Sequence, residues 1–247
     1  MAGWLDGVVI ENRQWSERLF SLRIRAPLAD FKAGQFVRVA LDIDGERVAR
    51  PYSLVNAPGD ELLEIYFNIV EQGPLTPRLA ALRPGDAIAV ADKATGFLVI
   101  DEVPESRHLW MLATGTGIGP FLSSLKTAQP WQRFDRVVLG YSVRSRDELS
   151  YIDTIEQLYV HYPEQFCFVP FVTRERVEDA LNVRITDALE SGEFERRAGI
   201  RISADDSHVM MCGNSAMIVQ ASELLHARGL RKHLRREPGH ISIEKYH

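Results

Sequence analysis

The sequence predicts a two-domain protein: an N-terminal antiparallel β-barrel and a C-terminal α/β domain built on a parallel sheet. In residues 1–100, short apolar segments alternate with turn signals, as is typical of a small barrel. In residues 101–247, apolar strands alternate with helical segments, as is typical of a parallel sheet with helices on both faces. A chain of 247 residues, 45% of them hydrophobic, is long enough for two modest domains.

The barrel strands are expected where alternating or β-branched patterns recur, at Gly7–Asn12, Leu19–Ala26, Gln35–Leu41, Leu62–Val70 and Ala87–Ala91. Turn signals such as Asp44-Gly45 separate these segments. One helix is expected over Thr76–Leu82. The polar stretch Asp101–Arg107, which contains a proline, is expected to link the two domains.

The second domain should contain four central strands, at Leu109–Ala113, Arg136–Ser142, Phe166–Val172 and Ser207–Cys212. The helices expected between and after them are Phe121–Thr127, Tyr151–His161, Thr186–Ser191 and Ala216–Ala227. The last residues, Ile241–His247, have the pattern of a further strand that ends in aromatic side chains.

Composition excludes several classes of protein. A net charge of -5 argues against a general nucleic-acid binder. The two cysteines, Cys167 and Cys212, are too few and too far apart for a disulfide framework, a zinc site or an iron–sulfur cluster. The N-terminus shows no signal-peptide pattern, and no apolar run is long enough to cross a membrane. We expect a cytoplasmic monomer with no metal, no nucleic acid and no membrane contact.

A glycine-rich turn in the second domain predicts a phosphate site. The strand Leu109–Ala113 runs without a break into Thr114 and then into three glycines at alternate positions, Gly115, Gly117 and Gly119. Backbone N–H groups and the positive end of a helix attract an anion, and glycine lets the backbone approach it closely. A tight turn that merely joins strand to helix would show the same pattern.

The next strand ends without the carboxylate that binds a ribose 2′-hydroxyl in an NAD site. Ser142 and Arg144 stand there instead, and both side chains suit a 2′-phosphate, which favours NADP over NAD. Arg174 follows the third strand, and Arg184 comes ten residues later, so three arginines are expected on the ligand side of the sheet. Arginines are also common in loops, which is the competing explanation.

Two motifs of the first domain carry groups that could hold a nucleotide. Arg50-Pro51-Tyr52-Ser53 is expected to follow a barrel strand, and it combines a guanidinium, an aromatic face and a hydroxyl. Gly73-Pro74-Leu75-Thr76 leads into a helix that Thr76 can cap. Alone, each motif could be a strand edge or a plain capped helix, but two anion sites in two domains suggest two nucleotides.

Two features near the C-terminus leave alternatives open. Cys212-Gly213-Asn214 ends a strand, and Cys212 could border a nicotinamide ring or be an ordinary core cysteine. The segment Leu230–Arg236 reads L-R-K-H-L-R-R, and it could steer an acidic partner or be a solvated charged segment.

In order and spacing, these motifs resemble the ferredoxin–NADP reductase family, in particular the short bacterial ferredoxin/flavodoxin–NADP reductases. The resemblance runs the full length. Its motifs are R-P-Y-S at Arg50–Ser53, G-P-L-T at Gly73–Thr76, A-T-G-T-G-I-G-P at Ala113–Pro120, S-V-R at Ser142–Arg144, the pair Arg174 and Arg184, and C-G-N at Cys212–Asn214. It implies a barrel that binds FAD and an α/β domain that binds NADP, with the C-terminal tail returning to the flavin.

The resemblance also implies roles for individual residues. Ser53, near the flavin, and Cys212, near the nicotinamide, are the catalytic candidates, because they would shape the approach of the two rings. The residues implied to bind FAD are Arg50, Pro51, Tyr52, Ser53, Tyr66, Gly73, Pro74, Leu75, Thr76, Thr116, Tyr246 and His247. The residues implied to bind NADP are Thr114, Gly115, Gly117, Gly119, Val143, Arg144, Thr173, Arg174, Arg184, Asn214, Ser215, Ala216 and Gln220.

The chain departs from the family pattern at its C-G-N motif and at its end. Ser215 stands where the family often has a proline, which changes the start of the following helix. Plant-type members end in a tyrosine that covers the flavin ring, whereas short bacterial members place terminal aromatics near the FAD adenine. Tyr246 and His247 are assigned to FAD on the bacterial pattern, and a proton-relay role of Glu244 stays open.

The implied function is that of an FAD-dependent ferredoxin (flavodoxin)–NADP+ reductase, which exchanges a hydride with NADP(H) and single electrons with ferredoxin or flavodoxin. These acidic carriers are expected to dock near Arg231, Lys232, Arg235 and Arg236. The alternatives are an NADPH-dependent flavin, quinone or haem-protein reductase on the same fold, and a non-catalytic nucleotide-binding module.

Overall fold

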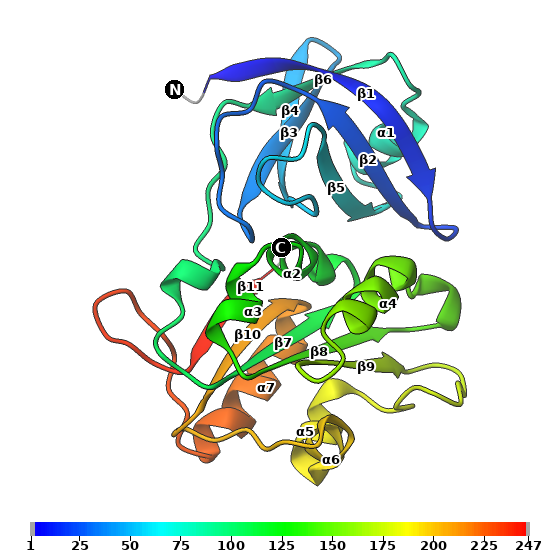
Figure 1. The fold of residues 1–247 in the computed structure, drawn as a ribbon. Coiled ribbons are helices and arrows are strands. Elements are labelled where there is room, and N and C mark those ends of the chain that lie inside the picture. Colours follow the sequence, from blue (N-terminus) through cyan, green and yellow to red (C-terminus); the bar gives the residue numbers. More distant parts are fainter. Residues whose placement is uncertain (1–2, 246–247) are drawn as a thin grey trace. The chain divides into compact units, whose positions relative to one another are not determined.

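The computed structural model describes residues 3–245 as two compact units (Figure 1). The first unit runs to Val99 and also takes in the segment Gly119–Thr127. The second unit holds Ile100–Ile118 and continues from Ala128. The helix that follows the glycine-rich turn is therefore grouped by its contacts with the first unit. Among the described residues, no helix is both long and apolar enough to cross a membrane.

The first unit is built on a six-stranded antiparallel sheet in the order β4-β3-β6-β1-β2-β5. Its strands are β1 (Trp4–Gln14), β2 (Leu19–Arg25), β3 (Phe36–Ile43), β4 (Glu46–Ser53), β5 (Leu63–Asn68) and β6 (Ala87–Ala91). A β-bridge between Leu54 and Ile65 joins the end of one edge strand to the other edge strand, so the sheet curls on itself. The antiparallel barrel that the sequence predicts is confirmed.

Side chains from alternate positions of these strands fill the barrel. Leu22 and Ile24 of β2 and Val37 and Val39 of β3 are buried in one cluster. The helix α1 (Thr76–Ala81) adds Leu79 to the same cluster. This packing fixes the short helix, and with it the Gly73-Pro74 turn that leads into it.

The strand β4 is absent from the sequence prediction. It pairs with β3 along its whole length through a hairpin whose turn residues, Asp44 and Gly45, both have positive φ, at 52° and 83°. Arg50-Pro51-Tyr52-Ser53 therefore forms the last four residues of a strand, and the expectation that it follows a strand is wrong. Charged and exposed residues hide the alternation in β4, but Asp-Gly is a strong hairpin signal that could have revealed it.

The second unit contains a five-stranded parallel sheet in the order β11-β10-β7-β8-β9. The strands are β7 (His108–Thr114), β8 (Arg136–Val143), β9 (Phe166–Val172), β10 (Ser207–Gly213) and β11 (Ile241–Lys245). The expected α/β domain with a parallel sheet is confirmed, and each predicted strand lies within two residues of its observed bounds where the chain is described.

Helices cover both faces of this sheet (Figure 1). The helices of this unit are α3 (Gln129–Arg133), α4 (Ile152–His161), α5 (Ile185–Ser191), α6 (Glu193–Ala198) and α7 (Ser215–Ala227), whereas α2 (Gly119–Leu125) is grouped with the first unit. On one face, α5, α6 and α7 share a core cluster with the strands, in which the rings of Trp110 and Phe194 meet edge to face at 5.2 Å. The sequence did not predict the helices α3 and α6, which have only five and six residues.

The order of the strands creates a switch point between β7 and β10. The chain begins in the middle of the sheet at β7, proceeds outward through β8 and β9, and then returns to the other side of β7 as β10. In open α/β sheets, ligands bind outside the carboxyl ends of the strands at such a reversal. The fold therefore places the ends of β7 and β10, at Thr114 and Gly213, where a ligand is expected.

Candidate functional site

The glycine-rich turn leaves β7 at the switch point. Gly115–Ile118 forms a single 3-10 turn, and Gly115 has a positive φ of 52°. Gly117 is buried, and a Cβ on it would overlap the carbonyl oxygen of Cys212. Gly115 is thus required by its left-handed conformation, and Gly117 is required by its close approach to β10. Thr116, between them, is half-buried.

The third glycine of the turn lies against the Arg50–Ser53 motif within the first unit. A Cβ on Gly119 would stand 3.4 Å from Val55 Cγ2 and 3.8 Å from the Cβ of Ser53. Ser123 of α2 donates a hydrogen bond of 2.7 Å to the carbonyl of Asn56. Lys126, whose pKa is lowered by burial, donates one of 3.0 Å to Val55. The start of α2 is thereby held beside the end of β4.

The Arg50–Ser53 motif offers groups that suit a flat, phosphate-bearing ligand. The Tyr52 hydroxyl is buried and has no hydrogen-bond partner among the described residues. Burial raises the pKa of this phenol, so the hydroxyl keeps its proton and can donate. Arg50 is exposed, and its Nη1 donates only to the neighbouring carbonyl of Ala49, at 2.8 Å. Pro51 is exposed and Ser53 is buried.

The Gly73–Thr76 turn is closed by its own hydrogen bonds. The Gly73 N–H donates to Val70 O at 2.8 Å, and the Val70 N–H donates to Thr76 Oγ1 at the same distance. The expectation that Thr76 caps α1 is wrong, because Leu75 is at the N-cap position and the Thr76 hydroxyl is engaged in the loop. Pro74 is exposed and Leu75 is buried.

Asn12, which was not predicted as a site residue, holds the C-terminal end of α1. Its side-chain amide lies 2.7 Å from Leu82 O and 3.0 Å from Ala80 O, and it thus satisfies carbonyls left unpaired where the helix ends. Asn12 lies in β1, so this contact ties the helix to the barrel wall. No local pattern predicts this contact, since the partners are about 70 positions apart.

Tyr66, which was predicted to bind FAD, lies on β5 and is buried, with its ring 6.4 Å from that of Trp15.

The predicted arginines lie at the carboxyl edge of the parallel sheet. The Arg174 N–H donates to Arg144 O at 2.8 Å, and the Thr173 N–H donates to Val143 O at 3.1 Å, so the ends of β8 and β9 stay paired beyond the strands. Arg184 is at the N-cap position of α5.

The guanidinium groups of Arg144, Arg174 and Arg184 are exposed and form no ion pair with a described carboxylate. The carboxylate of Glu148, a residue that was not predicted, accepts a hydrogen bond of 2.9 Å from the Arg144 N–H and braces that turn. Ser142 is buried within β8.

At the end of β10, the Cys212–Asn214 motif leads into α7. Asn214 Oδ1 accepts hydrogen bonds from the N–H groups of Ala216 and Met217, at 2.9 and 3.2 Å, which caps the helix. Asn214, Ser215, Ala216 and Gln220 are exposed, whereas Cys212 is fully buried. Glu244, on β11, is half-buried, and Tyr246 and His247 lie outside the described residues.

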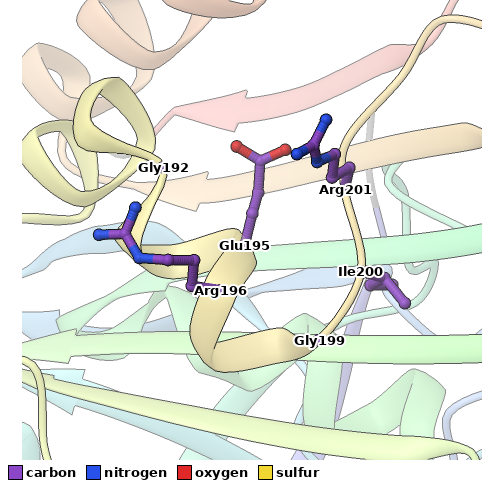
Figure 2. A pocket seen from close by; sticks show the side chains of 6 residues that line it. All are labelled: Gly192, Glu195, Arg196, Gly199, Ile200 and Arg201. Carbon is purple, nitrogen blue, oxygen red and sulfur yellow. The ribbon is translucent and has the colours of Figure 1, made fainter.

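A cavity of about 520 Å³ lies at the opposite edge of the sheet, where the strands begin (Figure 2). It is lined by Gly192, Glu195, Arg196, Gly199, Ile200 and Arg201. Glu195 is already paired, since its carboxylate lies 2.7 Å from Arg228 Nη1 and accepts the Ile202 N–H at 2.8 Å. None of the predicted site residues lines this cavity.

Comparison with known proteins decides what the site belongs to. Residues 8–93 match the oxidoreductase FAD-binding domain family, and residues 111–223 match the oxidoreductase NAD-binding domain family. Flavodoxin/ferredoxin–NADP reductases of Shigella flexneri and Escherichia coli (strain K12) are each 45% identical over 247 residues, which is 100% of both chains. The chain belongs to the flavodoxin/ferredoxin–NADP reductase family. It is therefore an oxidoreductase with an FAD-binding barrel and an NADP-binding α/β domain.

Solved structures agree with this family. A ferredoxin NADP+ reductase from Neisseria gonorrhoeae, with bound FAD and NADP, has a TM-score of 0.94 and 32% identity, covering 99% of each chain. The flavohem-like FAD/NAD-binding domain of a Vibrio cholerae nitric oxide dioxygenase has a TM-score of 0.81 at 19% identity, covers 100% of this chain and 99% of its own, and shows the fold alone. The unpartnered Tyr52 hydroxyl fits a bound FAD, and the unpaired arginines fit the phosphates of NADP.

Replacing Asn12 with alanine should weaken FAD retention and lower the melting temperature. The carbonyls at the end of α1 would lose their donor, and an unpaired buried polar group costs about 1–3 kcal/mol. The measurements are the FAD dissociation constant and the thermal transition of the FAD-bound protein. Asn68→Ala is the matched control, because Asn68 is exposed at the end of β5. If the two variants retain FAD equally well, Asn12 does not support the turn.

Proposed function

We propose that this protein exchanges electrons between NADP(H) and a ferredoxin or flavodoxin, with FAD as its bound cofactor. The observation that carries the proposal is the unpaired trio Arg144, Arg174 and Arg184 at the carboxyl edge, in a chain that matches flavodoxin/ferredoxin–NADP reductases over their full length. Such a site suits a dinucleotide that carries an extra phosphate. When bound, FAD supplies the conversion between two-electron and one-electron transfer.

FAD binding is assigned to the two motifs of the barrel. Arg50 pairs with the diphosphate, and the Tyr52 ring lies against the flavin. The Tyr52 hydroxyl, which has no partner among the described residues, forms a hydrogen bond with the cofactor. Tyr66 and the turn Gly73–Thr76 complete the site, together with Pro51, Ser53 and Thr116. The Tyr52 hydroxyl is protonated and can donate to the cofactor, and burial holds its pKa above that of an exposed tyrosine.

NADP binding is assigned to the carboxyl edge of the parallel sheet. The trio of arginines, with Val143 and Thr173, holds the 2′-phosphate end, and Thr114, Gly115, Gly117 and Gly119 face the diphosphate. Asn214, Ser215, Ala216 and Gln220, at the exposed start of α7, take the nicotinamide side. Cys212 and Ser53 have no acid–base role here; they shape the space available to the reacting rings.

The balance of the reaction requires two carrier molecules for each nucleotide. NADPH loses a hydride, which is two electrons and one proton, and becomes NADP+. Each ferredoxin or flavodoxin accepts one electron, so two carriers are reduced and one proton is released. In the opposite direction, two reduced carriers and one proton convert NADP+ into NADPH.

The carriers are proposed to be attracted by the cationic loop between α7 and β11, which carries Arg231, Lys232, Arg235 and Arg236 on its exposed side. Arg235 is anchored by Glu102 at 3.0 Å, whereas Lys232 and Arg236 have no ion-pair partner among the described residues. The loop lies where the strands of the parallel sheet begin, at the edge opposite the arginine trio. It therefore suits long-range attraction of an acidic carrier better than contact with the nicotinamide.

The proposed function is tested on the purified protein. It should be yellow, lose its visible flavin band when NADPH is added without oxygen, and regain that band when oxidised ferredoxin or flavodoxin follows. A colourless protein would contradict the FAD assignment. A yellow protein that NADPH does not bleach would be a nucleotide-binding module, and bleaching without reoxidation by either carrier would indicate a different acceptor.

Changing Arg144 and Arg184 together to alanine should raise the KM for NADPH at least about 10-fold and leave that for NADH nearly unchanged. Each guanidinium forms charge-assisted hydrogen bonds with a phosphate, worth about 1.5–3 kcal/mol each. Steady-state kinetics with both nucleotides checks this. Arg176→Ala is the control, since Arg176 is an exposed arginine on the same loop. An equal loss with both nucleotides would contradict the 2′-phosphate assignment.

Reversing the charge of Lys232 and Arg236 to glutamate should slow carrier reduction and flatten its dependence on salt. Exposed charges act over a Debye length of about 8–10 Å, so the effect should fade as ionic strength rises. Stopped-flow kinetics at several salt concentrations measures it, with ferricyanide as a small acceptor for comparison. The control pair, Arg196→Glu with Arg201→Glu, makes the same charge change beside the cavity of Figure 2. Equal slowing by both pairs would show that net charge matters and the loop does not.

A further inference from the structure

At the switch point, one side chain joins the ends of the two central strands. Thr114 is the last residue of β7, and its Oγ1 accepts a hydrogen bond of 2.7 Å from the N–H of Asn214, just beyond β10. The two residues are 100 positions apart in sequence. Both lie in the second unit, so this contact is made within the unit that holds the parallel sheet.

The hydroxyl supplies an acceptor that the backbone no longer offers. The parallel pairing of β10 with β7 ends at Cys212 and Ala113. Beyond this pair, β7 turns away into the 3-10 turn at Gly115, whose φ is 52°. The Thr114 side chain takes the place of the next backbone carbonyl, and the N–H of Asn214 is satisfied by it.

The backbones on either side of this hydrogen bond are in close contact. Gly213 has a φ of 136°, and a Cβ there would overlap Thr114 Oγ1 and stand 2.9 Å from Thr114 O. A Cβ on Gly117 would overlap Cys212 O and stand 3.0 Å from Gly213 Cα. The turn after β7 and the turn after β10 are thus in contact at their glycines, and the Thr114 hydroxyl links them by a hydrogen bond.

The hydrogen bond continues into α7. Asn214 receives the bond from Thr114 at its backbone and caps the helix through its side chain, to Ala216 N at 2.9 Å and Met217 N at 3.2 Å. A change at Thr114 therefore reaches the start of α7 through a single residue. Cys212 lies two positions before Asn214 in the same segment, so the place of Cys212 also depends on this hydrogen bond.

We propose that Thr114 is a positioning residue whose hydroxyl aligns the Cys212–Asn214 turn with the phosphate-binding turn Gly115–Gly119. The inference rests on the proposed function, since it concerns the NADP site of that reaction. In it, the side chain of Thr114 acts through Asn214. It sets the place of the nicotinamide relative to the diphosphate and contributes little to the 2′-phosphate end, which the arginines on β8 and β9 hold.

The test compares Thr114→Val with Thr114→Ser. Valine keeps the shape and removes the acceptor, whereas serine keeps the oxygen. In the FAD-bound protein, valine should lower kcat for NADPH with ferricyanide roughly 10-fold or more, with a smaller change in KM, because misplacing reacting groups costs rate. Serine should restore kcat. Thr154→Val removes a threonine hydroxyl on α4, at a position assigned no part in the site, so it is the matched control and should leave kcat unchanged.

Two binding and exchange measurements do not depend on turnover. The affinity for 2′-AMP should be the same in all variants, because this probe engages only the arginine end. In the wild-type protein, the Asn214 amide should exchange slowly with deuterium although the residue is exposed, and it should exchange at least several-fold faster in Thr114→Val.

Defined outcomes would overturn the inference. A wild-type kcat in Thr114→Val, a serine variant as slow as the valine variant, or fast wild-type exchange at Asn214 would each do so. If Thr114→Val fails to fold, the wild-type exchange rate and the serine variant still decide. Failure of the proposed function looks different, since then the wild-type protein itself would not oxidise NADPH.

Discussion

The pairing of β7 with β10 is the constraint on which the rest of the second unit depends. Two strands from distant parts of the chain run parallel in the centre of the sheet, and each ends in a glycine-containing turn at the same edge. Gly117 and Gly213 allow these turns to touch, because neither position has room for a Cβ. The turn after β7, to which we assign the phosphates of the nucleotide, is therefore part of the sheet's own packing.

The helix after this turn carries the second constraint. By its contacts, α2 belongs with the barrel, where Ser123 and Lys126 donate to the carbonyls of Asn56 and Val55. The segment that receives these bonds directly follows the Arg50–Ser53 motif. One covalent stretch, from Thr114 to Lys126, thus begins in the NADP-binding unit and ends in the FAD-binding unit. Two glycines of this stretch make close contacts: Gly117 lies against Cys212, and Gly119 lies against Val55.

The sequence predicted both sheets, most of their strands and the motifs of the site, because periodicity, Gly and Pro are local signals. It failed where a contact with another segment, near or far along the chain, decides the structure. Strand β4 exists because it pairs with β3, and its exposed charges conceal this. Threonine is a common N-cap residue, but the Thr76 hydroxyl accepts a hydrogen bond from the N–H of Val70 instead. Asn12 bonds a carbonyl 70 positions away, and Glu148 accepts from the backbone of Arg144 at the end of β8. Neither residue belongs to a recognisable motif, so the sequence did not predict these contacts.

The distribution of paired and unpaired cations argues for a polyanionic ligand at one edge of the sheet. Where the strands begin, Arg107 pairs with Asp135 at 2.6 Å and Arg228 pairs with Glu195 at 2.7 Å, although Lys232 and Arg236 of the same edge form no ion pair with a described residue. At the carboxyl edge, nearby carboxylates are available, yet Glu148 accepts from the Arg144 backbone and leaves the guanidinium free. The side chains of Arg144, Arg174 and Arg184 at this edge are exposed and form no ion pair with a described carboxylate. Under the proposed function, a nucleotide phosphate would pair with these cations, and its binding would stabilise the folded state.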